Sequence, residues 1–378
     1  MSTPRVAIVC DWLIELGGAE RVIKAVHEMY PDAPIYTSQF RSKQAVWFAE
    51  MDVRTGWLNY FPARLKRFIP FLRLLYFSRL KLAGYDVVIS ITGAEAKAVR
   101  TDKKTLHISY MHAPTQYYWT LYDQYIENPG FGVLNPVARL GLRLLVKPLR
   151  KADYKAAQGP DVIIANSSYI QNEIKQYYDR ESTVIWPNVD VAGIQKLTTK
   201  KQPPREGFIT YGRQVSWKRI DLAIDACVRM REKLLVIGSG PEHDELVRRA
   251  GGSKYITFLP KYRGIAEIVP HIQASKAYIF PSIEPFGIAP VESLAAGTPI
   301  IALQKGGALD FVDDTNGVFF AEQTVESVCE AIADFNTREF DAAAVRRSAQ
   351  QFSETSFRKQ LAAVVDAQYA TLNHEKNN

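Results

Sequence analysis

The sequence predicts an α/β protein built from two doubly wound domains, each a parallel sheet covered by helices. Short apolar runs alternate with helical stretches along most of the 378 residues, the pattern of parallel strands joined by crossover helices. A chain of this length exceeds one ordinary core, since domains usually hold about 100–200 residues. Ligands of doubly wound sheets bind at the carboxyl ends of the strands, so we expect a site where the two domains face each other across a central cleft.

Ten short apolar runs are expected to be strands, five in each half of the chain. The first five are residues 5–9, 86–90, 106–110, 162–165 and 183–185. The second five are residues 208–211, 234–237, 255–258, 277–280 and 299–302. Their short length and their β-branched and aromatic content favour buried strands.

Composition predicts the domain boundaries. Residues 1–190 form the expected N-terminal domain and residues 207–352 the C-terminal one. Residues 191–206 contain the polar, proline-bearing stretch Thr198-Thr-Lys-Lys-Gln-Pro-Pro-Arg205, which is typical of a linker. Residues 353–378 are expected to form a C-terminal helix that can cross back to the N-terminal domain.

The composition, with 47% hydrophobic and 23% charged residues, is that of a soluble globular protein. The chain has no run of about 18 uncharged apolar residues, so no membrane span is expected. The N-terminus leads into an apolar strand without the basic start and cleavage site of a signal peptide. Cys10, Cys227 and Cys329 show neither metal-ligand spacing nor a disulfide framework, which fits a reducing cytoplasm.

The net charge of +7 is concentrated in two stretches. Residues 53–85 contain seven Lys or Arg and no acid, and residues 129–152 contain five and no acid. Residues 61–81 and 137–155 mix such cations with large apolar side chains, a composition suited to an anionic membrane interface. The alternative is a pair of buried helices whose Lys and Arg side chains extend to water. A basic surface also suits nucleic acid. Because no nucleic-acid-binding motif is present, no nucleic-acid partner is expected.

The most informative motif is Glu284-Pro-Phe-Gly-Ile-Ala-Pro-Val-Glu292, in which two carboxylates stand eight residues apart. Between them lie Phe286, Gly287 and Ile288. We expect Glu284 in a strand-to-helix loop and Glu292 in the first turn of the next helix, with Pro290 at an early helical position. Amides flanked by two acceptors suit a polyhydroxylated, phosphorylated ligand such as a nucleotide sugar. The alternative is a loop carboxylate plus a glutamate that complements the helix dipole.

Two further turns carry groups suited to phosphate. Arg213 and Lys218 follow the strand 208–211. Arg offers a bidentate fork and Lys a compact charge, so together they can neutralise a diphosphate without a metal. Gly17 and Gly18 follow the first strand and open a helix, where backbone amides favour an anion. The alternative in both places is a plain connecting turn.

His112 follows the strand 106–110 and begins the aromatic run His112-Ala-Pro-Thr-Gln-Tyr-Tyr-Trp119. A histidine at the carboxyl end of a strand can hydrogen-bond a sugar or stabilise charge near neutral pH. Its alternative role is structural. The glycines at 238 and 240, and those at 306 and 307, either shape a ligand pocket or form simple turns.

In chain order, these pieces resemble a family 4 glycosyltransferase of the GT-B fold over nearly the whole length. The Pro281-Ser…Glu284-Pro-Phe-Gly…Glu292 segment is the specific part, supported by Trp186-Pro-Asn-Val-Asp190 and Ala296-Gly-Thr-Pro299. The run from His112 to Trp119 is similar to bacterial mannosyltransferases of surface-polysaccharide (O-antigen or exopolysaccharide) assembly. That subgroup often has an Arg where Gln116 stands here.

The resemblance implies a role for each matching residue. Glu284 would contact the donor sugar and Glu292 the ribose, while Arg213 and Lys218 would hold the diphosphate and His112 would face the reacting sugar. The implied donor-binding residues are Gly17, Gly18, Arg213, Lys218, Glu284, Phe286, Gly287, Ile288 and Glu292. The implied catalytic residues are His112, Arg213, Lys218 and Glu284.

The resemblance also implies a retaining, metal-independent transfer without a cofactor. The sugar, expected to be mannose from GDP-mannose, would pass from the C-terminal domain to a lipid-linked glycan on the N-terminal domain, at the cytoplasmic membrane face. The sequence contains no Asp-x-Asp motif, which agrees with metal independence. Two alternatives stay open: another GT-B enzyme, such as an inverting transferase or a nucleotide-sugar epimerase, and a membrane- or nucleic-acid-binding protein with a vestigial sugar site.

Overall fold

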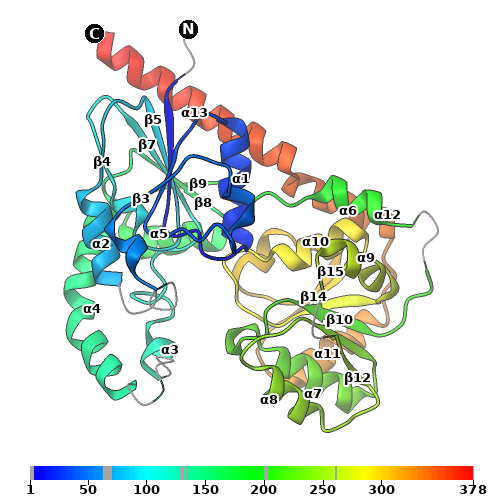
Figure 1. The fold of residues 1–378 in the computed structure, drawn as a ribbon. Coiled ribbons are helices and arrows are strands. Elements are labelled where there is room, and N and C mark those ends of the chain that lie inside the picture. Colours follow the sequence, from blue (N-terminus) through cyan, green and yellow to red (C-terminus); the bar gives the residue numbers. More distant parts are fainter. Residues whose placement is uncertain are drawn as a thin grey trace. The chain divides into compact units, whose positions relative to one another are not determined.

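The computed structural model describes residues 4–62, 70–127, 132, 135–199, 203–259 and 262–377. The chain divides into two compact units (Figure 1). Unit 1 contains Met1–Trp186 and Arg358–Asn378, and unit 2 contains Pro187–Phe357. Unit 1 is therefore assembled from two separate pieces of the sequence, whereas unit 2 is continuous.

Unit 1 is built around a seven-stranded parallel sheet with the strand order β3-β2-β1-β5-β7-β8-β9. The strands are β1 (Val6–Cys10), β2 (Ile35–Thr37), β3 (Val53–Thr55), β5 (Val87–Thr92), β7 (Leu106–Met111), β8 (Val162–Ala165) and β9 (Thr183–Val184). Every residue of the central strands β1, β5 and β7 is buried, as expected for a parallel sheet covered on both faces.

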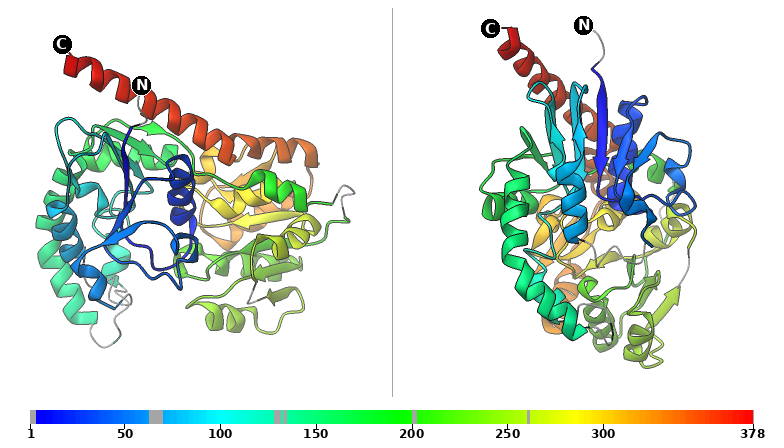
Figure 2. Two further views of the ribbon diagram at one scale, coloured as in Figure 1. Left: turned by 45° about the horizontal axis from the view of Figure 1, so that its top comes forward. Right: turned by 60° about the vertical axis from the view of Figure 1, so that its left-hand side comes forward.

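Unit 1 also contains α-helices. They are α1 (Gly18–Met29), α2 (Pro70–Arg79), α3 (Tyr122–Glu127), α4 (Asn135–Ala157), α5 (Ser168–Tyr178) and most of α13 (Glu354–Asn377). Helices α2 and α4 lie side by side on one flank of the unit (Figures 1 and 2). Near them, β4 (Lys81–Leu82) and β6 (Arg100–Thr101) form a separate two-stranded parallel ladder.

Unit 2 holds a six-stranded parallel sheet with the order β12-β11-β10-β13-β14-β15. The strands are β10 (Phe208–Tyr211), β11 (Leu234–Ile237), β12 (Ile256–Leu259), β13 (Ala277–Phe280), β14 (Ile300–Leu303) and β15 (Gly317–Phe320). The helices are α6 (Val191–Leu197), α7 (Ile220–Met230), α8 (His243–Ala250), α9 (Ile265–Ala274), α10 (Ile288–Ala296), α11 (Val325–Phe335) and α12 (Ala342–Ser348). Apolar side chains of α7 and α11 join those of the sheet in one buried core.

The two α/β units with parallel sheets confirm the predicted fold class. Four expected strands, at 162–165, 208–211, 234–237 and 277–280, have the predicted ends. Strands β2, β3 and β15 of the two large sheets were not predicted from the sequence, nor were the two-residue strands β4 and β6. Strands β2 and β3 have three residues each, too few to show a periodic pattern, and β15 begins with Gly317, a residue that weakens a strand signal.

Part of the expected linker is a helix instead. Residues 191–197 form α6, in which Val191 and Ile194 are buried. The side chain of Asp190 accepts a hydrogen bond from the amide of Gly193 at 2.8 Å, an N-cap that starts the helix. At the other end of the chain, α13 begins at Glu354, one residue from the expected start of the C-terminal helix. Within the described ranges, no helix combines the length and apolarity needed to cross a membrane.

Candidate active site

In unit 2, Glu284 and Lys218 form an ion pair between two strand-end loops. Glu284 lies in the loop between β13 and α10, and Lys218 lies between β10 and α7. The Lys218 Nζ atom is 2.5 Å from Glu284 Oε1, and the side chains are 21% and 18% exposed. The hydroxyl of Ser282 lies 2.9 Å from the same carboxylate oxygen. The pair is thus oriented by its neighbours and still open to solvent, as a ligand-binding pair has to be.

A second loop supports the backbone that carries Glu284. The Gly307 amide donates to the Glu284 carbonyl at 2.8 Å. A Cβ atom at Gly307 would lie 2.3 Å from the Phe286 carbonyl oxygen, so only glycine fits this contact. At the end of the loop, Gly287 has φ +121°, which L side chains rarely adopt, and Ile288 then begins α10. The glycines at 306–307 therefore shape the Glu284 loop.

Glu292 lies one turn deeper in α10 than expected. It is the fifth residue of the helix, and the first turn contains no acid, so the expectation of a first-turn glutamate is wrong. Its side chain is 4% exposed. The hydroxyl of Tyr211 lies 3.2 Å from Glu292 Oε2 and 2.6 Å from the Ala289 carbonyl oxygen. Burial and the neighbouring Glu292 raise the pKa of Tyr211, so its hydroxyl remains a donor at neutral pH.

Arg213 borders a cavity of about 630 Å³ at the carboxyl edge of the unit 2 sheet. The cavity is lined by Gly212, Arg213, Gly238, Ser239, Tyr262, Arg263 and Glu267. The Gly238 turn is packed closely, because a Cβ atom there would lie 2.2 Å from the Gly212 carbonyl oxygen. Arg213 itself is exposed and has no ion pair with another described residue. Its charge is therefore uncompensated, whereas that of Lys218 is balanced by Glu284.

In unit 1, His112 follows β7 as expected, and its imidazole is neutral. Burial lowers the pKa of His112 to about 4. The Nε2 atom is buried and has no hydrogen-bond partner among the described residues, although the backbone amide donates to Thr92 at 2.8 Å. An unpartnered buried ring nitrogen is uncommon. At neutral pH, His112 can form a hydrogen bond with a ligand but supplies no positive charge.

Asp11, which the sequence analysis did not single out, fixes the loop after β5. Its buried carboxylate accepts hydrogen bonds from the Thr92 hydroxyl at 3.0 Å, the Gly93 amide at 2.9 Å and the Ala96 amide at 2.8 Å. An ideal Cβ atom at Gly93 would be 3.8 Å from His112 Cβ. Asp11 therefore orders the loop beside His112. Its position directly after β1 was the available signal, since a polar side chain at a strand's carboxyl end often serves a site.

Gly17 and Gly18 occupy the predicted turn at the start of α1. Gly17 is the N-cap residue, with an extended φ of −157° and no side chain to cap an amide. The carboxylate of Glu20 comes close, 3.2 Å from where a Gly17 Cβ would lie. The turn therefore has the expected strand-to-helix position, and a side chain at Gly17 would crowd Glu20.

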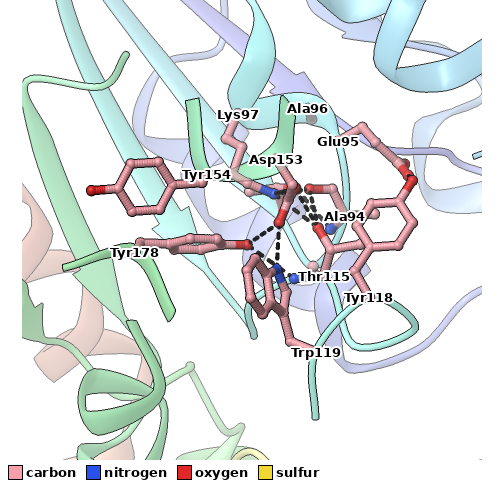
Figure 3. Close-up of polar contacts among 12 residues, drawn as sticks. Ala94, Glu95, Ala96, Lys97, Thr115, Tyr118, Trp119, Asp153, Tyr154 and Tyr178 are labelled. Carbon is pink, nitrogen blue, oxygen red and sulfur yellow. Dashed lines mark hydrogen bonds and ion pairs between the residues drawn. The ribbon is translucent and has the colours of Figure 1, made fainter. Parts of the chain in front are cut away.

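Two buried ion pairs hold α2 and α4 against the loop after β5, and Figure 3 shows the pair that involves α4. Arg73 of α2 pairs with Glu95 at 2.8 Å, and Lys97 pairs with Asp153 of α4 at 2.6 Å. Asp153 also accepts hydrogen bonds from the side chains of Thr115, Trp119 and Tyr178. Arg73 belongs to the basic segment 61–81, so one cation expected at a membrane is buried instead. Residues 63–69 of that segment lie outside the described residues.

Two Rossmann-like units, with polar and charged side chains at their strand ends, define the GT-B architecture. Residues 195–354 match the family described as Glycosyl transferases group 1. The chain thus carries a group 1 glycosyltransferase domain.

Among curated relatives, the chain is 25% identical to human alpha-1,3/1,6-mannosyltransferase ALG2 over 238 residues, which is 53% of this chain and 57% of ALG2. It is 28% identical to glycogen synthase of Mycobacterium tuberculosis over 225 residues, 55% of this chain and 53% of that protein. The chain spans about half the length of the curated relatives it matches. Among solved structures, Anabaena HepE in complex with UDP and glucose superposes with a TM-score of 0.66 at 18% identity, covering 96% of this chain and 100% of that one.

Proposed function

We propose that the chain is a retaining, metal-independent glycosyltransferase. It moves a sugar from a nucleotide-diphosphate donor to a lipid-linked glycan at the cytoplasmic face of a membrane. The observation that carries the proposal is the half-open Lys218–Glu284 ion pair at the carboxyl edge of the unit 2 sheet. A carboxylate and an ammonium group held together there match the two chemistries of a sugar diphosphate, hydroxyl donors and phosphate oxygens.

The donor is held by residues of unit 2. The diphosphate lies at Arg213 and Lys218, because a diphosphate needs about two positive charges for neutralisation. Lys218 then divides its hydrogen bonds between phosphate and Glu284, whose freed oxygen accepts from a sugar hydroxyl. Glu292 accepts from the ribose hydroxyls, and Tyr211 keeps its carboxylate in place. Amides at Gly287 and Ile288 complete the donor site. Phe286 is buried and packs against Phe311 and Phe352, so its side chain supports the loop and does not contact the donor.

The transfer step breaks the bond between the anomeric carbon and the diphosphate oxygen, which takes the electron pair. The acceptor hydroxyl forms its bond from the same face, and its proton passes to a phosphate oxygen of the leaving group. Arg213 and Lys218 stabilise the charge that develops on the diphosphate. Gly17 and Gly18 approach the phosphates and the acceptor, and neutral His112 hydrogen-bonds the reacting sugar.

Mannose, delivered as GDP-mannose, is the first candidate for the transferred sugar. Similarity to the mannosyltransferase ALG2 supports it, and the similarity to glycogen synthase makes other donors the natural comparison. Calorimetric titration with GDP-, UDP- and ADP-sugars tests the donor class. We expect GDP-mannose to bind at least about tenfold more tightly than the others, a difference of about 1.4 kcal/mol. Binding of none of them would refute the proposal.

An inverting transfer is the second candidate, and one observation favours it. The neutral imidazole of His112, with its buried unpartnered Nε2, is in the form that a general base requires. NMR of the product's anomeric configuration separates the two mechanisms. Retention supports the proposal, whereas inversion would overturn it and make His112 the base.

The exposed face of α4 supports the membrane part of the proposal. Val137, Leu140 and Leu144 are 69%, 59% and 68% exposed, and exposed lysines follow toward the end of the helix at 147, 151 and 155. Apolar side chains followed by cations suit an anionic membrane surface. Sedimentation with vesicles tests this contact: Leu140→Ser/Leu144→Ser should weaken binding, and unchanged binding would remove α4 from it.

A further inference from the structure

A groove with apolar walls runs between α2 and α4 of unit 1. Its volume is about 690 Å³, and its walls include Phe71 and Leu75 of α2 and Ala152 and Ala156 of α4. The turn and strand at residues 97–102 close one side. None of the residues assigned above to the candidate active site lines it, so the groove needs a separate explanation.

Cations outnumber acids among the described lining residues of this groove. Lys81 and Arg100 are direct partners in the β4–β6 ladder, and both are exposed whereas Leu82 is buried. Lys155 of α4 is a third lining cation. None of the three forms an ion pair with another described residue, and Asp102 is the single acid among the described lining residues. The arrangement favours an anionic ligand.

The walls of the groove are held in place before any ligand arrives. The Arg73–Glu95 pair fixes α2. The Lys97–Asp153 pair, shown in Figure 3, fixes α4 to the turn at 96–98. All four side chains are almost completely buried. A preformed groove avoids the cost of ordering its walls on binding. Its rim also exposes a large apolar side chain, since Phe71 is 56% exposed.

We infer that this groove binds one anionic phospholipid. Its phosphate lies at Lys81, Arg100 and Lys155, and one acyl chain lies along the apolar wall formed by α2 and α4. Apolar walls with cations among the lining residues match an amphiphile better than a free anion, because a free anion has no apolar part to place against the walls. The inference rests on the proposed membrane-associated function and goes beyond it, because it assigns a single saturable lipid site.

Calorimetry on the full chain tests the site with three probes. They are dihexanoyl-phosphatidylglycerol below its critical micelle concentration, dihexanoyl-phosphatidylcholine, and sn-glycerol 3-phosphate. We expect the phosphatidylglycerol to bind one to one. The other two should bind at least about tenfold more weakly, because one lacks the net charge and the other the chains. Equal binding of sn-glycerol 3-phosphate would overturn the inference in favour of a simple anion site, and no lipid binding would refute it.

Variants locate the binding on the molecule. Lys81→Gln/Arg100→Gln/Lys155→Gln should weaken phosphatidylglycerol binding on the order of a hundredfold, since each cation near an anionic lipid contributes about a fivefold factor. The matched control Lys43→Gln/Lys196→Gln/Lys254→Gln removes three exposed cations elsewhere and should bind like the parent. Ser78→Trp fills the groove without a change of charge and should also abolish binding. The proposed lipid site would be overturned if the control variant lost as much phosphatidylglycerol binding as the triple variant, or if Ser78→Trp bound phosphatidylglycerol as tightly as the parent.

The calorimetric titration with GDP-mannose is repeated on each variant. Unchanged nucleotide binding beside lost lipid binding supports two independent sites. Absence of nucleotide binding in the parent, with one-to-one lipid binding intact, would refute the proposed donor site and leave the groove standing.

Discussion

We expect Asp153→Asn to lower the free energy of unfolding of unit 1 by about 3–5 kcal/mol. Asp153 is fully buried, and Lys97 is 1% exposed at a distance of 2.6 Å. Asparagine keeps an acceptor oxygen for Trp119 and Tyr178, which both donate to Oδ2 of Asp153. Its amide NH2 then replaces Oδ1, which accepts from Thr115, and the negative charge is lost, so the Lys97 ammonium is left buried without a counter-charge. Removal of one partner of a buried pair typically costs about 3–5 kcal/mol. The carbonyl of Ala94 and the hydroxyl of Thr115, which also accept from Lys97, carry no full charge and cannot replace the carboxylate.

A double-mutant cycle isolates the charge pair from its neighbours. Lys97→Met should also destabilise, but Lys97→Met/Asp153→Asn removes both charges and should recover about 3 kcal/mol relative to the sum of the single variants. Hydrogen exchange of peptides from α4 and α5 against urea reports the stability of unit 1, and peptides from β10 and β13 serve as an internal reference in unit 2. The same cycle on the exposed pair Arg229–Glu326, with 59% and 66% exposed side chains, should show a coupling of about 0–1 kcal/mol. A Lys97–Asp153 coupling below about 1 kcal/mol would refute the reasoning.

Four further predictions concern the site and its supports. Glu284→Gln should lower sugar transfer about a hundredfold or more with an unchanged melting temperature, whereas Glu326→Gln should leave transfer intact; equal activities would remove Glu284 from the site. Arg213→Met should raise the donor Kd about tenfold or more by calorimetry, because a charge-assisted contact is lost, and an unaffected Kd would place the diphosphate elsewhere. Gly307→Ala should reduce both transfer and stability, because its Cβ would meet the Phe286 carbonyl oxygen at 2.3 Å. Gly141→Ala, within α4, has open space and should reduce neither. Burial lowers the pKa of His112 to about 4, so the unfolded chain binds more protons than the folded chain between pH 4 and 6.5, and the free energy of unfolding should fall as the pH falls through this window. His112→Gln should make that fall shallower by up to one proton, about 1.4 kcal/mol per pH unit. Parallel plots of unfolding free energy against pH for the parent and the variant would contradict the buried neutral form.

The α/β architecture could be predicted from the sequence because the alternation of short strands and helices is a local property of the sequence. Strand-end motifs such as Gly212-Arg213 and the Glu284 loop were readable for the same reason, since a turn after a buried run identifies the edge of a sheet. The ion pair between Lys218 and Glu284 could not be predicted from the sequence, because the two residues are 66 positions apart and no local pattern relates them.

The buried charges of unit 1 were misread for a related reason. Arg73 lies in a stretch of cations and large apolar residues, and local composition alone favours a surface position for each charge. Its burial depends on Glu95, which arrives from the loop after β5. Glu292 illustrates a smaller error: α10 starts at Ile288, just after the left-handed Gly287, and this places Glu292 in the second turn, where it meets Tyr211. Boundaries set by backbone conformation are the least readable part of a sequence.

The last helix makes the order of synthesis relevant to folding. Arg358 of α13 bonds to Glu28 of α1, so a residue near the start of the chain waits for a partner made after the whole of unit 2. Tyr30 likewise has its pKa raised to about 12 by burial and by Asp366. During synthesis, residues 1–186 therefore leave the ribosome with part of one surface uncovered, and that part stays uncovered until unit 2 and α13 have been made. Residues 1–186 expressed alone would keep this surface open, and addition of a peptide of residues 354–377 in trans is the natural way to cover it.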